Sequence, residues 1–195
     1  MWIITNTGAQ FDLRWIKPDT ISILDIAHAL ANTNRYTGHA ARPISVAEHS
    51  LLVVEILERE AAEHRPEVLL AALLHDAHEA YTGDLSSPMK QLLGPLWATE
   101  ERRIQHSVLH TLNSLTHYLR HECLIKHADL VALATERRDL MPDTGPAWPA
   151  LEGIAPVDWI NLRARDDFGW LDWRQAFLDS YAALRVAAAE SRLEA

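Results

Sequence analysis

Residues 68–76 read Val-Leu-Leu-Ala-Ala-Leu-Leu-His-Asp, an apolar run that ends in two adjacent metal-binding side chains. A buried imidazole or carboxylate costs free energy unless it has a partner, so His75 and Asp76 call for a functional explanation. His49 upstream and Asp129 downstream complete an H…HD…D pattern. Two imidazoles and two carboxylates suit one divalent ion (Co, Mn, Zn, Fe or Ni), with positions left for water and substrate.

The segments on both sides of this run have the hydrophobic periodicity and the end signals of helices. Ser22 and Ser45 each begin a capping box, Pro66 stands at a first helical position, and Ser87-Pro88 reads as an N-cap with proline at the first helical position. We predict an all-α fold, a helical bundle with a small N-terminal β-hairpin. The expected hairpin covers residues 2–13, and the expected helices cover residues 22–32, 45–63, 66–82, about 96–116, about 122–140 and 172–190.

The length of 195 residues fits one domain with a well-buried core. We expect a single domain over residues 1–195, with its core at about 20–140 and with residues 141–195 packing on that core. The C-terminal part is rich in tryptophan, which we expect to anchor it; an aromatic platform for a nucleotide base is the alternative. These tryptophans are Trp148, Trp159, Trp170 and Trp173.

Charge and cysteine content narrow the functions open to this chain. A formal net charge of -9 argues against binding a nucleic-acid polymer, which requires a basic surface. A small anionic substrate remains compatible, because a bound dication and a few Arg or Lys side chains reverse the local field. Cys123 is the single cysteine, so no intrachain disulfide is expected and a reducing cytoplasm is the expected location. Residues 1–6 do not resemble a signal peptide, and no apolar run approaches a membrane span.

The expected ligands come from three helices, which is how a helical bundle builds a rigid metal site. On the expected helix over residues 66–82, His75 and Glu79 are four positions apart and share one face. Glu79 would then lie beside the ion without being needed as a ligand. A carboxylate in that position is a natural proton-transfer group, so we predict that Glu79 is catalytic.

Further residues near this pattern are candidates for catalysis and substrate binding. Asp84 follows Gly83 in a turn and can bind a hydroxyl or a water, and Lys90 can face a phosphate. Arg35 follows the first expected helix and is a candidate phosphate clamp. Tyr36 beside it is suited to stacking on a base or packing on a sugar.

These motifs together resemble the HD-domain phosphohydrolase superfamily. Within it they are most similar to the small bacterial and phage 5′-deoxynucleotidases, the YfbR/YfdR-like group. The resemblance extends from the hairpin to about residue 154. The matching strings are RY at 35–36, AEHS at 47–50, LHDAHEAYTGDL at 74–85, SPMK at 87–90, KHAD at 126–129, LATERRDL at 133–140 and WPALEGI at 148–154.

The resemblance implies a five-helix HD core that hydrolyses a phosphate ester of a deoxynucleotide. It implies one divalent metal on the four residues of the H…HD…D pattern. Glu79 and Asp84 match residues that assist catalysis and substrate positioning, and Arg35 matches a phosphate-contacting arginine. Tyr36 departs from the family, since the best-known monophosphatases carry there a tryptophan that checks the sugar. The sugar preference is therefore open.

Several alternatives also stay open. A phage relative removes triphosphate from dATP, so a dNTP triphosphohydrolase is the nearest alternative enzyme; a non-catalytic nucleotide-binding HD module is an alternative of another class. A structural zinc site is disfavoured, because such sites favour cysteine ligands. Residues 136–139, Glu-Arg-Arg-Asp, are either a substrate or subunit contact or a solvated helix face. We expect a homodimer or higher homo-oligomer that binds a small nucleotide, with no membrane or nucleic-acid partner.

Overall fold

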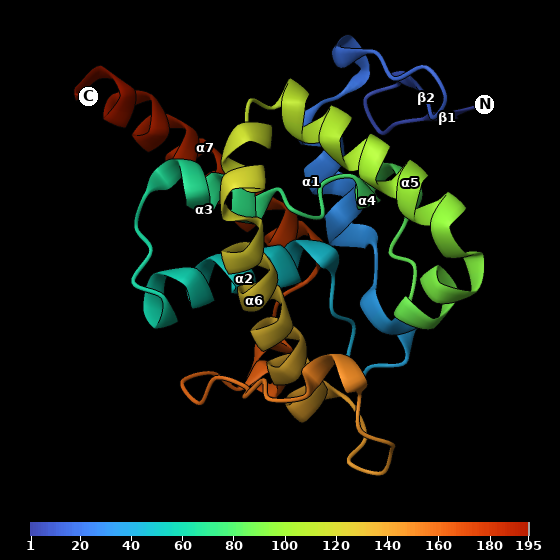
Figure 1. Ribbon diagram of the computed structural model, residues 1–195, viewed down its shortest axis with the longest axis vertical. Helices are drawn as coiled ribbons and strands as arrows, with labels where there is room; N and C mark the ends of the chain where they lie inside the picture. The colour runs from blue at the N-terminus through green and yellow to red at the C-terminus, as the bar shows by residue number, and fades with distance from the viewer. Residues whose placement is uncertain (195) are drawn as a thin grey trace.

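The structure, a computed structural model, describes residues 1–194 and is a bundle of helices with one short hairpin at its edge (Figure 1). In the hairpin the two strands are antiparallel, and Ile3 lies opposite Phe11. The predicted all-α class with a small hairpin is confirmed. The elements are β1 Trp2–Ile4, β2 Gln10–Asp12, α1 Ile23–Asn32, α2 Val46–Glu60, α3 Pro66–Leu73, α4 Glu79–Thr82, α5 Ser87–Thr111, α6 Leu115–Leu140 and α7 Trp170–Glu194, with 3-10 turns at Pro18–Thr20, Arg35–Gly38, Pro149–Leu151 and Leu162–Arg165.

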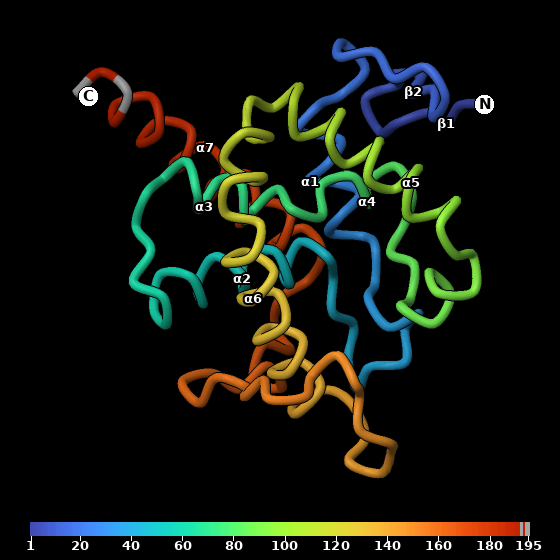
Figure 2. The backbone as a smooth tube through the Cα atoms, viewed as in Figure 1, coloured from blue at the N-terminus to red at the C-terminus, as the bar shows by residue number. Residues whose placement is uncertain are grey.

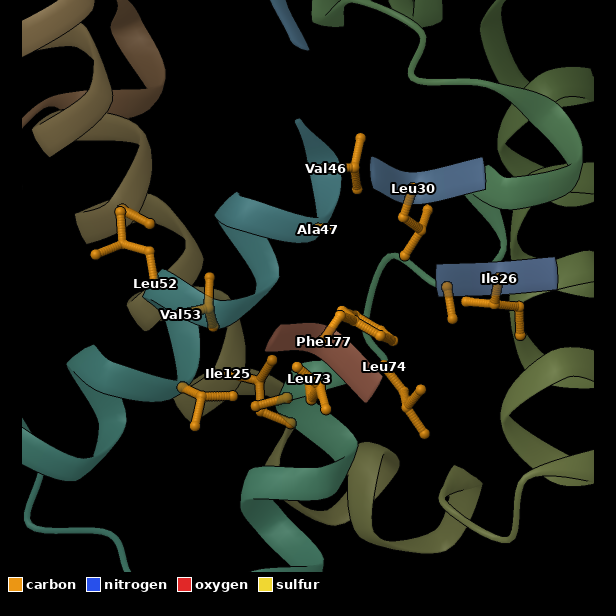
Figure 3. Close-up of a cluster of buried hydrophobic side chains, with 14 of the residues drawn as sticks. Ile26, Leu30, Val46, Ala47, Leu52, Val53, Leu73, Leu74, Ile125 and Phe177 are labelled. Carbon is orange, nitrogen blue, oxygen red and sulfur yellow. The ribbon is translucent and has the colours of Figure 1, made fainter. Parts of the chain in front are cut away.

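The apolar run over residues 68–74 forms the centre of the core. α3 lies against α2, α6 and α7, and the side chains of residues 68–74 are all buried. Leu73 and Leu74 lie in one apolar cluster with Ile125 of α6 and Phe177 of α7 (Figure 3). Because its neighbours come from helices far apart in the sequence, close packing holds the C-terminal end of α3 in place.

The expected continuous helix over residues 66–82 is wrong. α3 ends early, a turn occupies residues 74–78, and α4 follows. In a continuous helix the Ala72 carbonyl would accept the N–H of the residue four positions later. Instead it accepts the backbone N–H of His75 at 3.2 Å, and the His75 Nδ1 atom lies 2.8 Å from it. This competition for one backbone acceptor ends the helix and places His75 and Asp76 in the turn.

Two other helices are longer than the sequence predicts. α5 and α6 both begin before the expected starts near residues 96 and 122. Gly94 has a φ of 67° and is followed by Pro95, so the backbone breaks inside α5 and its first part lacks a continuous helical period. His121, with a φ of −120°, interrupts α6 in a similar way. Both interruptions hide the first parts of these helices from a search for periodicity, although the Ser87-Pro88 signal marks where α5 begins.

The C-terminal part passes round the end of α6 and then returns to the core (Figure 2). Residues 141–169 are mostly loop, as expected. Asp139 accepts the backbone N–H of Leu162 at 2.8 Å, and Arg138 donates to the Val157 carbonyl, so the end of α6 holds this loop. α7 then lies against α1, α2 and α3. Within residues 1–194, no helix is both long and apolar enough to cross a membrane.

Candidate metal centre

The start of α2, which carries His49, is held by two polar contacts. Ser45 Oγ accepts the Glu48 N–H at 3.1 Å, as the capping box predicts. The Glu48 carboxylate pairs with Arg42 at 2.6 and 2.9 Å rather than completing the box. Arg42 also donates to the Leu162 carbonyl, at 2.9 Å from its Nε. The segment with His49 is therefore tied to the C-terminal part of the chain.

Donor atoms of three predicted ligands converge. A ring nitrogen of His49, a ring nitrogen of His75 and a carboxylate oxygen of Asp76 all lie within 4.8 Å of one another. Asp76 Oδ2 is 3.1 Å from His75 Nε2 and 3.8 Å from His49 Nε2. Asp129 Oδ1 is 3.1 Å from His49 Nε2, while its Oδ2 is 2.6 Å from Lys126 Nζ. The role of Asp129 as a fourth ligand stays a prediction.

The buried ring nitrogens test whether these residues fit a cation. The Nε2 atoms of His49 and His75 are both buried, and within the described part of the chain neither makes a hydrogen bond of regular geometry. Each instead lies 3.1 Å from a carboxylate oxygen, His49 from Asp129 and His75 from Asp76. Buried polar atoms without partners are rare and call for a ligand or a water. Two imidazole lone pairs beside carboxylate oxygens are a donor set that first-row divalent metals prefer. The cluster can therefore hold one such ion.

The charges around His49 favour a cation on its ring. Burial and the nearby Arg35 lower the pKa of His49, but the carboxylates of Glu136 and Asp129 outweigh them and raise it to about 9. Burial would raise the pKa of Asp76, yet the nearby His75 and His49 hold it well below its usual value. The site is thus an anionic cluster that attracts a proton or a metal ion, and the two compete for the same ring.

Glu79 lies near this cluster, although not by the expected route. It stands at the start of α4, across the turn from His75, and its carboxylate is buried. Its Oε2 atom has no hydrogen-bond partner within residues 1–194. Burial raises the pKa of Glu79 well above its usual value, and the charges of Asp76 and Asp84 raise it further. A buried carboxyl that readily holds a proton has the properties of an acid–base group.

Asp84 and Lys90 follow α4 as the chain enters α5. Gly83, with a φ of 76°, ends α4 in a left-handed conformation that favours glycine, and Asp84 comes next. Burial raises the pKa of the Asp84 carboxyl, while Arg35 opposes the shift. Lys90 Nζ is 2.7 Å from Glu101 and 3.7 Å from Glu79. The substrate-contact roles of Asp84 and Lys90 stay predictions.

His78, Glu79 and Glu101 form a second convergent group, with donor atoms within 4.8 Å of one another. Here the ammonium of Lys90 already lies against both carboxylates. A side-chain cation therefore already contacts this group, although both ring nitrogens of His78 lack a hydrogen-bond partner among the described residues.

Glu136 is the residue that sequence reasoning missed. Its carboxylate is fully buried on α6, 2.7 Å from His49 Nδ1 and 3.1 Å from Arg35 Nε, and it accepts the Tyr36 hydroxyl. Burial raises the pKa of Glu136, but Arg35 and His49 lower it more, so the group is an anion. The alternatives considered for residues 136–139 did not include a buried partner of a ligand. Glu136 lies seven positions after Asp129, which on a helix means the same face, and this spacing was the available signal.

Arg35 and Tyr36 lie on the Glu136 side of the site. Arg35 is buried, and its Nη1 is 3.9 Å from Asp76 Oδ2, so it reaches the edge of the ligand cluster. The centroids of the Tyr36 and Trp148 rings are 5.9 Å apart, and the Tyr36 hydroxyl donates a hydrogen bond to Glu136. Whether Tyr36 reads a sugar or base stays a prediction.

The fold and this centre define an all-α protein with a histidine–aspartate cluster that can hold a divalent metal. The family model described as HD domain matches residues 27–127, and the chain belongs to the HD-domain family, within the HD-domain phosphohydrolase superfamily. The match includes Arg35, His49, His75 and Asp76 and ends just before Asp129.

Curated relatives agree with this family. The uncharacterized protein YfdR of Escherichia coli K12 is 38% identical over 161 residues, which cover 83% of this chain and 84% of that protein. An uncharacterized protein of Rhodobacter capsulatus is 38% identical over 109 residues, which cover 55% of this chain and 56% of that protein.

Proposed function

We propose that this protein hydrolyses the phosphate ester of 5′-deoxynucleoside monophosphates, releasing the deoxynucleoside and phosphate, with one divalent metal as cofactor. The observation that carries the proposal is the convergence of His49, His75 and Asp76 at a point that Arg35 also reaches, 3.9 Å from Asp76. Convergent metal ligands beside a guanidinium suit a phosphate group, which takes a metal on one oxygen and Arg on the others.

A bound divalent ion would supply a Lewis acid for a phosphoryl oxygen and would lower the pKa of a water. The protein's own part is to place the phosphate and to move protons. Arg35 would bind the phosphate oxygens. Because Arg35 is already buried and held by Glu136, its side chain would lose little conformational entropy when the phosphate binds. The unpartnered Glu79 Oε2 would accept the proton of the attacking water.

The position of Glu79 also favours an enzyme over a non-catalytic nucleotide-binding module. A buried carboxyl with an unpartnered oxygen costs stability, and a protein that only binds nucleotides gains nothing from it. Such groups are concentrated at catalytic sites. The number of phosphates on the substrate is a separate question, because a triphosphate could use the same ligands and Arg35.

Phosphate release from a panel of nucleotides tests the proposal. The panel should contain dNMPs, NMPs and dNTPs, each with Co, Mn, Zn, Fe or Ni added to metal-stripped protein. We expect phosphate from dNMPs in the presence of metal and none after chelation. Inorganic triphosphate from dNTPs, detected after added polyphosphatase, would instead identify a triphosphohydrolase. No product from any of these compounds with any metal would reject the proposal.

We further propose that the enzyme is cytoplasmic and works as a homodimer or higher homo-oligomer. Light scattering after size-exclusion chromatography measures the mass in solution. A single species at the 22.0 kDa of one chain would reject the oligomer.

A further inference from the structure

The buried carboxylate of Glu136 connects two halves of the candidate site. Its Oε1 atom lies 2.7 Å from Nδ1 of His49, a predicted metal ligand. Its Oε2 atom accepts the Arg35 Nε–H at 3.1 Å and also accepts the Tyr36 hydroxyl. Each oxygen thus serves a different half: Oε1 contacts a metal ligand, and Oε2 contacts the turn that carries the candidate phosphate clamp.

We propose that Glu136 is a positioning residue that holds the metal ligand His49 and the phosphate-binding Arg35 together, one with each carboxylate oxygen. The part that concerns His49 stands on the metal cluster alone. The part that concerns Arg35 rests on the proposed function.

The contact with Oε1 selects the form of the His49 ring that can bind a metal. A carboxylate is only an acceptor, so Nδ1 of His49 keeps its hydrogen, and when the ring gives up a proton to bind a metal the free lone pair is on Nε2. Nε2 is the atom that faces Asp129 at 3.1 Å and Asp76 at 3.8 Å. A carboxylate that holds the far side of a ligating imidazole fixes its tautomer and orientation.

The contacts with Oε2 hold a turn whose backbone is strained. Arg35 begins the 3-10 turn Arg35–Gly38, in which Tyr36 (φ 57°) and Thr37 (φ 53°) adopt left-handed conformations. Left-handed backbone at residues other than glycine persists only where surrounding contacts impose it. Oε2 binds both of the first two side chains of the turn, and so it determines the direction in which the Arg35 guanidinium points.

The substitution Glu136→Gln tests both halves at once. Its amide keeps one acceptor oxygen and replaces the other with an NH2 group, which cannot accept. If the oxygen faces Arg35 and Tyr36, the NH2 group donates to Nδ1 of His49 and forces the hydrogen onto Nε2, where the metal should bind. If the oxygen faces His49, Arg35 and Tyr36 both lose their acceptor.

Either orientation should therefore damage a measurable half of the site. In the first, we expect Co²⁺ to bind about 10- to 100-fold more weakly, the usual effect of removing an outer partner of a metal ligand. In the second, Co²⁺ affinity is kept and the KM for a dNMP rises by about tenfold or more. Co²⁺ titration with its visible absorption spectrum, together with the split between KM and kcat, distinguishes the two. Wild-type values for Co²⁺ affinity, spectrum and KM would overturn the proposal.

Asp139→Asn is the matched control. Asp139 is a buried carboxylate on the same helix, and it contacts Arg138 and the backbone of Leu162 rather than the metal cluster. We expect this variant to keep Co²⁺ affinity and KM within about twofold of wild type, even if it melts at a lower temperature. If Asp139→Asn bound Co²⁺ as weakly as Glu136→Gln does, or raised KM as much, the effect would come from a general destabilisation of α6. The positioning role would then be rejected.

A measurement on the wild-type protein covers the case in which Glu136→Gln does not fold. In ¹⁵N-histidine NMR of the Zn²⁺-bound protein, we expect His49 to show a slowly exchanging Nδ1–H and a metal-shifted Nε2. A metal-shifted Nδ1 would overturn the proposal. These metal readouts do not need a substrate, so a protein without phosphatase activity would reject the proposed function and leave the His49 half standing.

Discussion

Two clusters of nearly the same side chains lie on either side of the turn between α3 and α4, and they are neutralised in different ways. The first joins His49, His75 and Asp76; the second joins His78, Glu79 and Glu101, and each group has its donors within 4.8 Å. In the second, Lys90 Nζ lies 2.7 Å from Glu101 and supplies a cation from the chain itself. In the first, the cation that reaches the carboxylate is Arg35, whose Nη1 stands farther off, 3.9 Å from Asp76 Oδ2.

From this difference we predict that residue types alone do not make a metal site. We expect imidazoles and carboxylates at short range to bind a metal when no side-chain ammonium lies within hydrogen-bond distance of the carboxylates, and to form an internal ion pair when one does. Changes to members of the two clusters, to the side chains beside them and to the pH test this prediction.

Removing a ligand from the first cluster should have the largest effect. We expect Asp76→Ala to lose its bound metal and all measurable turnover while it keeps its helical content, because Asp76 Oδ2 lies within reach of both imidazoles. Elemental analysis and phosphate release measure the two losses. Glu101→Gln, in the second cluster, should keep its metal content. Full metal occupancy in Asp76→Ala would show that the ion binds elsewhere.

Glu79 belongs to the second cluster but is predicted to act on the substrate of the first. Glu79→Gln should keep its metal and lose about 10²–10⁴-fold in kcat, the usual contribution of a proton-transfer group. The change preserves the size of the side chain and removes only the carboxylate. Steady-state kinetics with the metal content measured in parallel would decide, and an unchanged kcat would mean that Glu79 has a structural role.

Arg35 and Tyr36 should differ in what they affect. Arg35→Ala should weaken the binding of every phosphorylated substrate alike, by about 10- to 100-fold, because it removes a charge-assisted contact. Tyr36→Ala should instead change the ranking of sugars and bases, since an aromatic ring reads shape and stacking. Kinetics of both variants on dAMP, AMP and dATP would separate the roles. A change of ranking in Arg35→Ala alone would reverse the assignment.

Metal binding to the first cluster should depend on pH. Because the pKa of His49 is raised to about 9, a proton occupies its ring over the neutral range and must leave when the metal binds. Metal affinity should therefore rise about tenfold per pH unit up to pH 9 and then level off. Calorimetry in two buffers with different ionisation enthalpies counts the released proton. An affinity that stays constant from pH 6 to pH 8 would contradict the competition.

Removing the cation of the second cluster should have the smallest effect and tests the comparison most directly. Lys90→Ala should lower stability by about 1 kcal/mol, or the melting temperature by about 2–4 °C, because its ion pair is partly exposed. The vacated group should then bind added Zn²⁺, so the metal should raise the melting temperature more than in wild type. Lys90→Arg keeps the charge and serves as the control. An equal response to Zn²⁺ in all three proteins would show that Lys90 does not substitute for a metal.

The amino-acid sequence alone determined the helical class, the central apolar run and the positions of the side chains predicted to bind a metal. Each of these is a local property: the period of residues 68–74, the capping serines and the adjacent His75 and Asp76 are visible within a few positions of the chain. Even the wrong prediction for residues 66–82 failed only in its middle, at the turn over residues 74–78, where the Ala72 carbonyl accepts from His75 instead of continuing the helix.

The tertiary structure decided which of these side chains work together. Glu136 meets His49 across 87 residues and Arg35 across 101, and no local period reports on contacts of that kind. Lys90 and Glu101 both belong to α5, where 11 residues of straight helix would keep them roughly 16 Å apart, so their 2.7 Å contact depends on the break at Gly94. Burial is the physical reason that these pairings depend on the tertiary structure. Only the packed helices remove the charges from water, and a buried charge needs a specific partner to be stable.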